Sequence, residues 1–217
     1  MSSQPIKPPS GYVFYFAYGS NMAAATMVRR QFHPEKSVVC ELPNYAISFN
    51  MFAIPYVELS ISSPTMKIGN GHKDLAYNVE TVTVNALDSS ESYEAVVLVT
   101  PREMTSSDHW PSRRYLDLCI SGAVEQGLPP KYVEWMKNQP CYDPANKTTL
   151  QRVGSYAFGI CFIPITMLLF FPTTYLAKNE IQAPALLPMC VLGVARLGRG
   201  AHNYGFTHVF GSGTNHE

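Results

Sequence analysis

The chain has 217 residues, 46% of them hydrophobic, and its 16 basic residues balance 16 acidic ones. This length predicts one domain with a sizeable core, or one domain with an appendage. A neutral chain gives no electrostatic sign of nucleic-acid binding, so we expect no nucleic-acid partner. The five cysteines are odd in number and form no CxxC pair, which argues against a disulfide framework and a zinc site. We expect buried free thiols and no metal.

Residues 1–11 contain no basic segment followed by an apolar run, so they do not match a secretory signal peptide. We expect a disordered leader here, in a protein of the cytoplasm. A folded domain is expected over residues 12–150, followed by an apolar extension over 151–197 and a flexible tail over 198–217.

The most informative stretch is residues 12–21. The seven residues before Gly19 are all aromatic or apolar, which predicts a strand buried on both faces. Gly19 predicts a tight turn, either with a positive φ angle or with the backbone close to a ligand. Ser20 and Asn21 are expected to cap a helix over residues 22–32. Backbone N–H groups at such a junction can hold an anion or a developing oxyanion, and the alternative is a capped turn without a ligand.

Two pairs of short segments predict the strands of a sheet. Residues 38–40 and 45–49 are strand candidates on either side of a turn at 43–44. Residues 79–84 and 93–100 are richer in β-branched side chains and predict a hairpin.

A second informative block covers residues 111–132. Tyr115, Cys119 and Ala123 recur at helical spacing, and Gly127 is a typical stop after a helix. The block therefore predicts a helix that presents one apolar face.

Both blocks resemble one protein family. Residues 15–22, which read Tyr-Phe-Ala-Tyr-Gly-Ser-Asn-Met, resemble the signature of the γ-glutamylcyclotransferase superfamily, whose members release a γ-glutamyl group as 5-oxoproline. Residues 111–132 are similar to a second block of that superfamily, in which Pro-Ser-x-x-Tyr is followed by a helix, Gly-Ala, an acidic residue and Gly-Leu-Pro. The two blocks also occur in the same order as in the family.

The resemblance implies an α+β fold: a small mixed β-barrel or bent sheet with flanking helices. It implies a small-molecule γ-glutamyl substrate and no cofactor. It assigns substrate binding to the signature segment and to one tyrosine hydroxyl, namely Tyr15, Phe16, Ala17, Tyr18, Gly19, Ser20, Asn21 and Tyr115. For Tyr115 the alternative is a core ring with its hydroxyl at the rim. Arg113 and Arg114 are either partners of a substrate carboxylate or solvated charges.

The general base is unassigned. The family places an acidic residue before a Gly-rich run and a tyrosine, and Tyr77 is the tyrosine here, but no glutamate stands before it. Asp74 is closest to the expected place, although loop aspartates commonly solvate turns. Glu58 belongs to a stretch upstream of the base. Glu80 shares one face of a strand with Val82, and we interpret it as a surface charge.

The last third of the chain is apolar. Residues 153–177 contain no charge and are long enough to cross a membrane, although Pro164 and Pro172 interrupt them. Residues 181–195 form a shorter apolar run, which favours a re-entrant or surface segment. The alternative is that both segments cover the barrel or form an oligomer interface.

Two functions remain open at this stage. The apolar C-terminal extension and the Pro-Tyr-Val-Glu stretch that ends at Glu58 resemble the fungal branch of the superfamily, which includes cyclotransferases of epipolythiodioxopiperazine pathways of the gliotoxin type. The resemblance thus implies a cyclotransferase acting on a glutathione-conjugated intermediate, with glutathione or γ-glutamylamines equally compatible. The alternative is a non-catalytic γ-glutamyl-binding or membrane-tethered scaffold protein without a general base.

Overall fold

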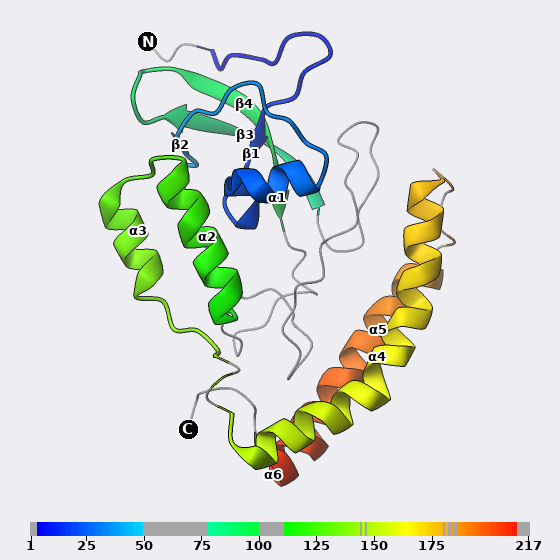
Figure 1. Cartoon of the computed structure of the whole chain (residues 1–217). Coiled ribbons are helices and arrows are strands. Elements are labelled where there is room, and N and C mark those ends of the chain that lie inside the picture. The colour runs from blue at the N-terminus through cyan, green and yellow to red at the C-terminus, as the bar shows by residue number, and fades with distance from the viewer. Residues whose placement is uncertain are drawn as a thin grey trace. The chain divides into compact units, whose positions relative to one another are not determined.

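The computed structural model describes residues 4–49, 78–99, 111–143, 145, 147–179, 181, 184 and 186–211. They form two compact units (Figure 1). The described residues of the first unit are 4–49, 78–99 and 113–140, and the second unit contains 111–112 and the chain from Cys141 onward. The expected end of the folded domain at residue 150 therefore falls inside the second unit.

The first unit contains a mixed sheet of four strands in the order β1-β4-β3-β2. The strands are β1 (Tyr15–Phe16), β2 (Cys40–Glu41), β3 (Asn78–Ala86) and β4 (Ser92–Val99). β1 is parallel to β4, and the other two pairings are antiparallel. The α+β class with a mixed sheet is confirmed, and over the described residues the sheet is open.

The β3–β4 hairpin was predicted correctly, but Glu80 within it is more buried than we expected. Glu80 and Val82 share a face of β3 as expected, and this face becomes buried at Val84. Glu80 is half-buried on that inward face, so it is not the surface charge that we expected. It pairs with Val97 of β4, which pairs in turn with Phe16 of β1.

The N-terminal segment contradicts two expectations. Ile6 is not part of a disordered leader, because its backbone N–H donates to the Ser92 carbonyl over 2.7 Å and its carbonyl accepts from Glu94 over 2.9 Å. β1 contains only two residues and is not buried on both faces, and Tyr12 before it is 53% exposed. Local composition overestimated the strand because only its last two residues pair with β4.

The expected strand at residues 38–40 overlaps the observed β2 at Cys40, whereas residues 45–49 have no strand. The turn between them is confirmed, and Asn44 adopts a φ angle of 65° within it. Asparagine tolerates this left-handed conformation better than most residues.

The described residues of the first unit also form four helical segments. They are the 3₁₀ helix η1 (Ser20–Met22), α1 (Ala24–Arg29), α2 (Arg113–Glu125) and α3 (Pro130–Lys137). Gly127 follows α2 with a φ angle of 70°, as expected for a helix stop. The buried side chains that join η1, α2 and α3 are Met22, Cys119, Ala123, Val133 and Met136.

From Thr149 onward, most of the described residues of the second unit are helical. Its segments are α4 (Thr149–Lys178), α5 (Leu186–Ala201), the π-helix η4 (His202–Phe206) and α6 (Thr207–Phe210). α4 and α5 lie side by side (Figure 1). The expected flexible tail is therefore wrong for residues 198–210, which continue the helix. The six residues after Gly211 lie outside the described part of the chain.

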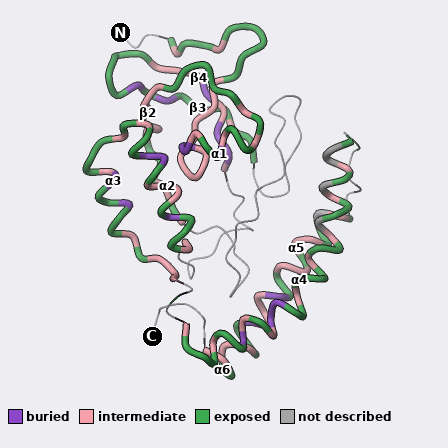
Figure 2. Tube along the Cα trace, viewed as in Figure 1, coloured by how far each residue is buried: buried purple, intermediate pink, exposed green. Residues whose placement is uncertain are grey.

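Aromatic packing holds this unit together at one end. The ring of Phe158 stacks on Phe162 at 4.5 Å and meets the edge of Phe206 at 5.3 Å. A Cβ at Gly154 would lie only 2.5 Å from Phe210 Cβ, so glycine allows α6 to contact α4. Figure 2 shows the buried residues of α4 near this end and mostly exposed ones along the rest of the helix.

Candidate active site

The signature segment is anchored to β4. Phe16 pairs with Val97, and the Tyr18 hydroxyl donates a hydrogen bond to the Leu98 carbonyl. The predicted binding residues from Tyr15 to Asn21 are all half-buried. The fold therefore positions the segment at one edge of the sheet, where the chain leaves β1.

The expected caps of the following helix were wrong. The Asn21 side-chain N–H donates to the Tyr15 hydroxyl oxygen over 2.7 Å, which closes the signature segment on itself. Ser20 and Asn21 belong to η1, and the N-cap of α1 is Ala23, whose side chain makes no cap hydrogen bond. The expected separate helix over 22–32 is the shorter α1.

Gly19 has no positive φ angle, because its φ is −127°. A Cβ at this position would lie 3.0 Å from the Tyr115 hydroxyl oxygen. The predicted positive φ angle is therefore wrong, and the predicted approach to a ligand stays a prediction, because the group that approaches Gly19 in the structure belongs to the protein itself. That group is a side chain of α2.

α2 thus brings the second sequence block against the first. Tyr115, Cys119 and Gly122 lie at positions i, i+4 and i+7 of the helix, which form one face. A Cβ at Gly122 would lie 2.5 Å from the Ala23 backbone nitrogen and 2.9 Å from Met22 Cβ. Only glycine allows this contact between α2 and the loop.

The Tyr115 hydroxyl lies between the signature backbone and a buried thiol. Burial raises the pKa of Cys119 to about 11, and a hydrogen bond with Tyr115 opposes the rise. Burial, followed by the nearby Cys119, also raises the pKa of Tyr132. A thiol with a raised pKa stays protonated at neutral pH, so Cys119 does not have the properties of a nucleophile. Its side chain packs in the buried cluster with Met22 and Ala123.

Of the predicted residues that remain, the structure describes Arg113 and Arg114. Arg113 and Arg114 are exposed on the first turn of α2. Glu58, Asp74 and Tyr77 lie outside the described residues, so the assignment of the base is untested. Within the described ranges, no three His, Cys, Asp or Glu side chains group in a way that could hold a metal ion.

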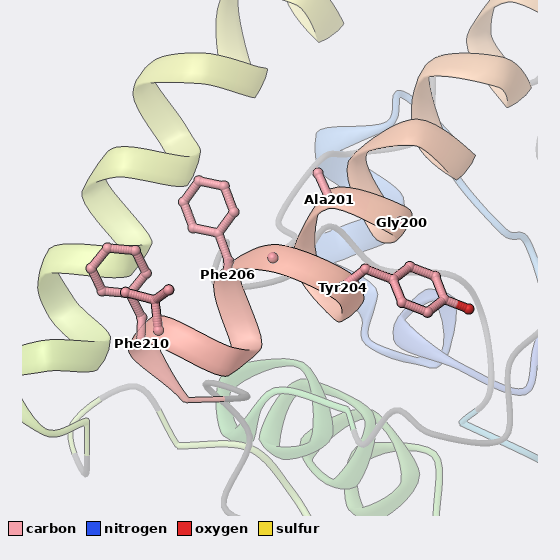
Figure 3. A pocket seen from close by; sticks show the side chains of 7 residues that line it. Gly200, Ala201, Tyr204, Phe206 and Phe210 are labelled. Carbon is pink, nitrogen blue, oxygen red and sulfur yellow. The ribbon is translucent and has the colours of Figure 1, made fainter.

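A hollow of about 410 Å³ lies in the second unit. It is lined by Gly200, Ala201, Tyr204, Gly205, Phe206, Val209 and Phe210 (Figure 3). This lining carries no charge and offers no set of polar groups for a γ-glutamyl substrate. The segment around Gly19 and Tyr115 remains the candidate active site.

The sequence of this chain is similar to those of several fungal enzymes. The chain is 26% identical to the γ-glutamyl cyclotransferase aclK of Aspergillus oryzae, over 76% of this chain and 75% of that protein. It is 22% identical to the γ-glutamyl cyclotransferase gliK of Aspergillus fumigatus, over 98% of this chain and 93% of that protein. The chain is a relative of fungal γ-glutamyl cyclotransferases. No protein-family model matches it.

Two further similarities are shorter or weaker. The γ-glutamyl cyclotransferase verK of Clonostachys rogersoniana is 34% identical over 38% of this chain and 45% of that protein. A solved γ-glutamyl cyclotransferase structure aligns with 58% of this chain and 87% of its own, at 19% identity and a TM-score of 0.41.

Sequence reasoning about these cyclotransferase-like blocks missed two residues of α2. Gly122 belongs to the Gly-Ala pair of the second block, and its i+7 spacing from Tyr115 was a usable signal. Glu125 is the acidic residue of the same block, and one of its carboxylate oxygens accepts a hydrogen bond from the Ala24 backbone N–H over 3.2 Å.

Proposed function

We propose that the chain is a γ-glutamyl cyclotransferase that releases 5-oxoproline from a small γ-glutamyl compound. The names of the two relatives that cover most of the chain support this activity. The observation that carries the proposal is the contact between Gly19 and Tyr115. It joins the two family-like blocks into one site.

The reaction is an intramolecular acyl transfer. The α-amine of the glutamyl group attacks its own γ-carbonyl carbon, a C–N bond forms, and the original amide C–N bond breaks. A proton leaves the attacking ammonium group, and a proton reaches the departing amine. Such a reaction requires a folded substrate, a base and stabilisation of the oxyanion.

In the proposed site, each part of the signature segment has a task. Because Gly19 carries no side chain, the Tyr115 hydroxyl can lie close to its backbone. Ser20 and Asn21 are the first residues of η1, so their backbone N–H groups have no acceptor within that helix. In the proposed reaction these N–H groups stabilise the oxyanion. The Tyr115 hydroxyl orients the glutamyl group. Tyr15, Phe16, Ala17 and Tyr18 connect this site to the sheet, through the pairing of β1 with β4 and the hydrogen bond from Tyr18 to Leu98.

The general base is not identified, and Asp74, which precedes β3 in the sequence, is the candidate that we propose to test for this role. Asp74→Asn tests this assignment: a loss of turnover in a folded variant supports it, and turnover at the wild-type rate eliminates Asp74. Glu80→Gln is the matched control, because Glu80 is a half-buried carboxylate of the adjacent strand.

The proposed substrate is a glutathione-conjugated intermediate of epipolythiodioxopiperazine biosynthesis. The fungal origin of the relatives supports this choice. The experiment mixes the purified chain with glutathione, γ-glutamyl dipeptides and a glutathione-conjugated diketopiperazine, and measures 5-oxoproline by chromatography with mass detection. An N-acetylated γ-glutamyl dipeptide is the control, because its blocked amine cannot attack. Release from none of the substrates by a folded protein would favour the non-catalytic alternative.

The proposed location is the cytoplasm, with attachment to a membrane through α4. Of the described helices, one is long and apolar enough to cross a membrane, and it covers Thr149–Thr173. The exposed side of α4 carries apolar residues such as Ile160, Leu168 and Phe171. The 25 charge-free residues from 153 to 177 span about 37 Å as a helix, which exceeds the roughly 30 Å of a bilayer core.

Labelling of cysteines tests the attachment. Cys190 is exposed on α5 beside α4, whereas Cys141 lies before the helices. In vesicles, a membrane-impermeant maleimide should label a chain whose single cysteine is Cys141 and spare one whose single cysteine is Cys190. Equal labelling of both variants, or failure of the protein to float with vesicles, would refute attachment.

A further inference from the structure

We propose that Glu125 is a positioning residue of the active site, which caps α1 from the end of α2 and so fixes the signature segment. One Glu125 carboxylate oxygen lies 3.2 Å from the Ala24 backbone nitrogen, the first amide of α1. The role deepens the proposed function and rests on it only for its kinetic consequence.

The start of α1 requires a cap that its own sequence does not provide. The first amides of a helix have no acceptor within the helix. Ala23 has the dihedral angles of an N-cap, φ −76° and ψ 122°, but an alanine side chain cannot accept a hydrogen bond. No acidic residue lies in the first turn of α1. A carboxylate from elsewhere in the fold therefore supplies the missing acceptor.

The negative charge of Glu125 is more favourable at the beginning of α1 than at the end of its own helix, α2. Glu125 is the last residue of α2, where a negative charge faces the negative end of the helix dipole. At the beginning of α1 the same charge meets the positive end of a dipole and accepts an N–H bond. The unfavourable position on α2 is thus compensated at α1.

A second contact fixes the geometry of this cap. Gly122 allows α2 to approach the Ala23 backbone, since any Cβ there would lie 2.5 Å from the Ala23 nitrogen. Tyr115, which lies ten positions before Glu125 on α2, contacts Gly19. α2 therefore holds the signature segment before η1 and again after it. Loss of the Glu125 contact should loosen the segment while the Tyr115 contact remains.

The test compares four variants of the full chain in 5-oxoproline release. We expect Glu125→Ala to lower kcat/KM about tenfold. The variant loses the cap of α1, and the signature segment before α1 is then displaced within the active site. Glu125→Gln, which keeps an acceptor, should lose about threefold or less. Asp117→Ala removes an exposed carboxylate of the same helix and should match the wild type.

Rescue distinguishes positioning from general destabilisation. Ala23→Ser introduces a capping oxygen at the N-cap of the same helix, and in the Glu125→Ala background it should restore kcat/KM to within about threefold of the wild type. A Glu125→Ala chain with wild-type kinetics, or a double variant without recovery, would overturn the role.

Amide hydrogen exchange separates this inference from the proposed activity. In Glu125→Ala, the amides of α1 should lose protection about fivefold or more, and Ala23→Ser should restore it. This readout needs no turnover. If the wild type releases no 5-oxoproline but the exchange pattern holds, the proposed activity fails and the cap stands. Unchanged exchange in Glu125→Ala refutes the cap itself.

Discussion

Gly19→Ala perturbs the contact on which the candidate site depends. The added Cβ would lie 3.0 Å from the Tyr115 hydroxyl oxygen, whereas carbon–oxygen contacts in proteins lie at about 3.3–3.6 Å. The hydroxyl is the far end of a side chain that is 36% exposed, so it moves more easily than the backbone. We therefore expect a displacement of about half an ångström at the hydroxyl.

This displacement should affect catalysis more than stability. Overpacking costs about 1–3 kcal/mol, with the low end expected for a movable group. Alanine also lowers the conformational entropy of the unfolded chain, which stabilises the folded state by about 0.4–1 kcal/mol. The free energy of unfolding should therefore fall by at most about 1 kcal/mol. A misplacement of 1 Å can cost about 100-fold in rate, so half of it should lower kcat/KM about tenfold.

The assay is 5-oxoproline release, combined with urea unfolding of the same variants. If alanine acts through the hydroxyl, Gly19→Ala should have no further effect in a Tyr115→Phe chain. Gly193→Ala is the matched control, because an added Cβ on this α5 glycine meets nothing within 4 Å. The reasoning is refuted if kcat/KM is unchanged in Gly19→Ala, or if the losses of the two single variants multiply in the double variant.

Three further substitutions test the packing around the site. Gly122→Ala should destabilise the fold by about 3 kcal/mol in urea unfolding, because its Cβ meets backbone at 2.5 Å, and a cost under about 1 kcal/mol would contradict the contact. Tyr15→Phe removes the 2.7 Å hydrogen bond from Asn21 and should cost about 1–2 kcal/mol, whereas an unchanged urea midpoint would show that the bond contributes nothing. Burial raises the pKa of Cys119 from its ordinary 9.0 to about 11, so the unfolded thiol ionises first and stability is lost as pH rises between these values. At about 1.4 kcal/mol per pKa unit this amounts to about 2–3 kcal/mol, and unfolding measured at pH 8 and pH 10.5 should show a steeper loss in the wild type than in Cys119→Ala.

The sequence predicted the sheet where the pattern was long. The β3–β4 hairpin was correct because both strands carry several β-branched residues in succession. β1 was overestimated, since seven apolar residues fit a strand by composition but only Tyr15 and Phe16 pair with β4. Pairing depends on a distant partner, and composition contains no information about that partner.

The alternation in β3 illustrates a related limit. A period of two shows that Glu80 and Val82 share a face, but it does not show which face is inward. A charged residue is usually exposed, so the outward face was the natural choice. The structure reverses it, because the same face continues to Val84, which is 3% exposed. The decisive information lay four residues further along the strand.

The candidate site was predictable as a set of residues but not as an arrangement. Resemblance to a family identified Gly19 and Tyr115 separately, and the two local alternatives for Gly19 were a positive φ angle and close approach of the backbone to a ligand. Neither the turn pattern nor the helix pattern could choose between them. The structure excludes the positive φ angle and adds a reason that neither pattern offered, because the group that approaches Gly19 is the Tyr115 hydroxyl of the second block.

The helix cap shows why a correct local rule can give a wrong residue. The rule that the first amides of a helix need an acceptor holds for α1. Sequence reasoning sought that acceptor among neighbours and selected Ser20 and Asn21, yet Asn21 is engaged with Tyr15. The acceptor comes from Glu125, which is adjacent only in the fold. An acidic residue at the end of its own helix is locally unfavourable, so such a residue indicates that its partner lies elsewhere in the fold.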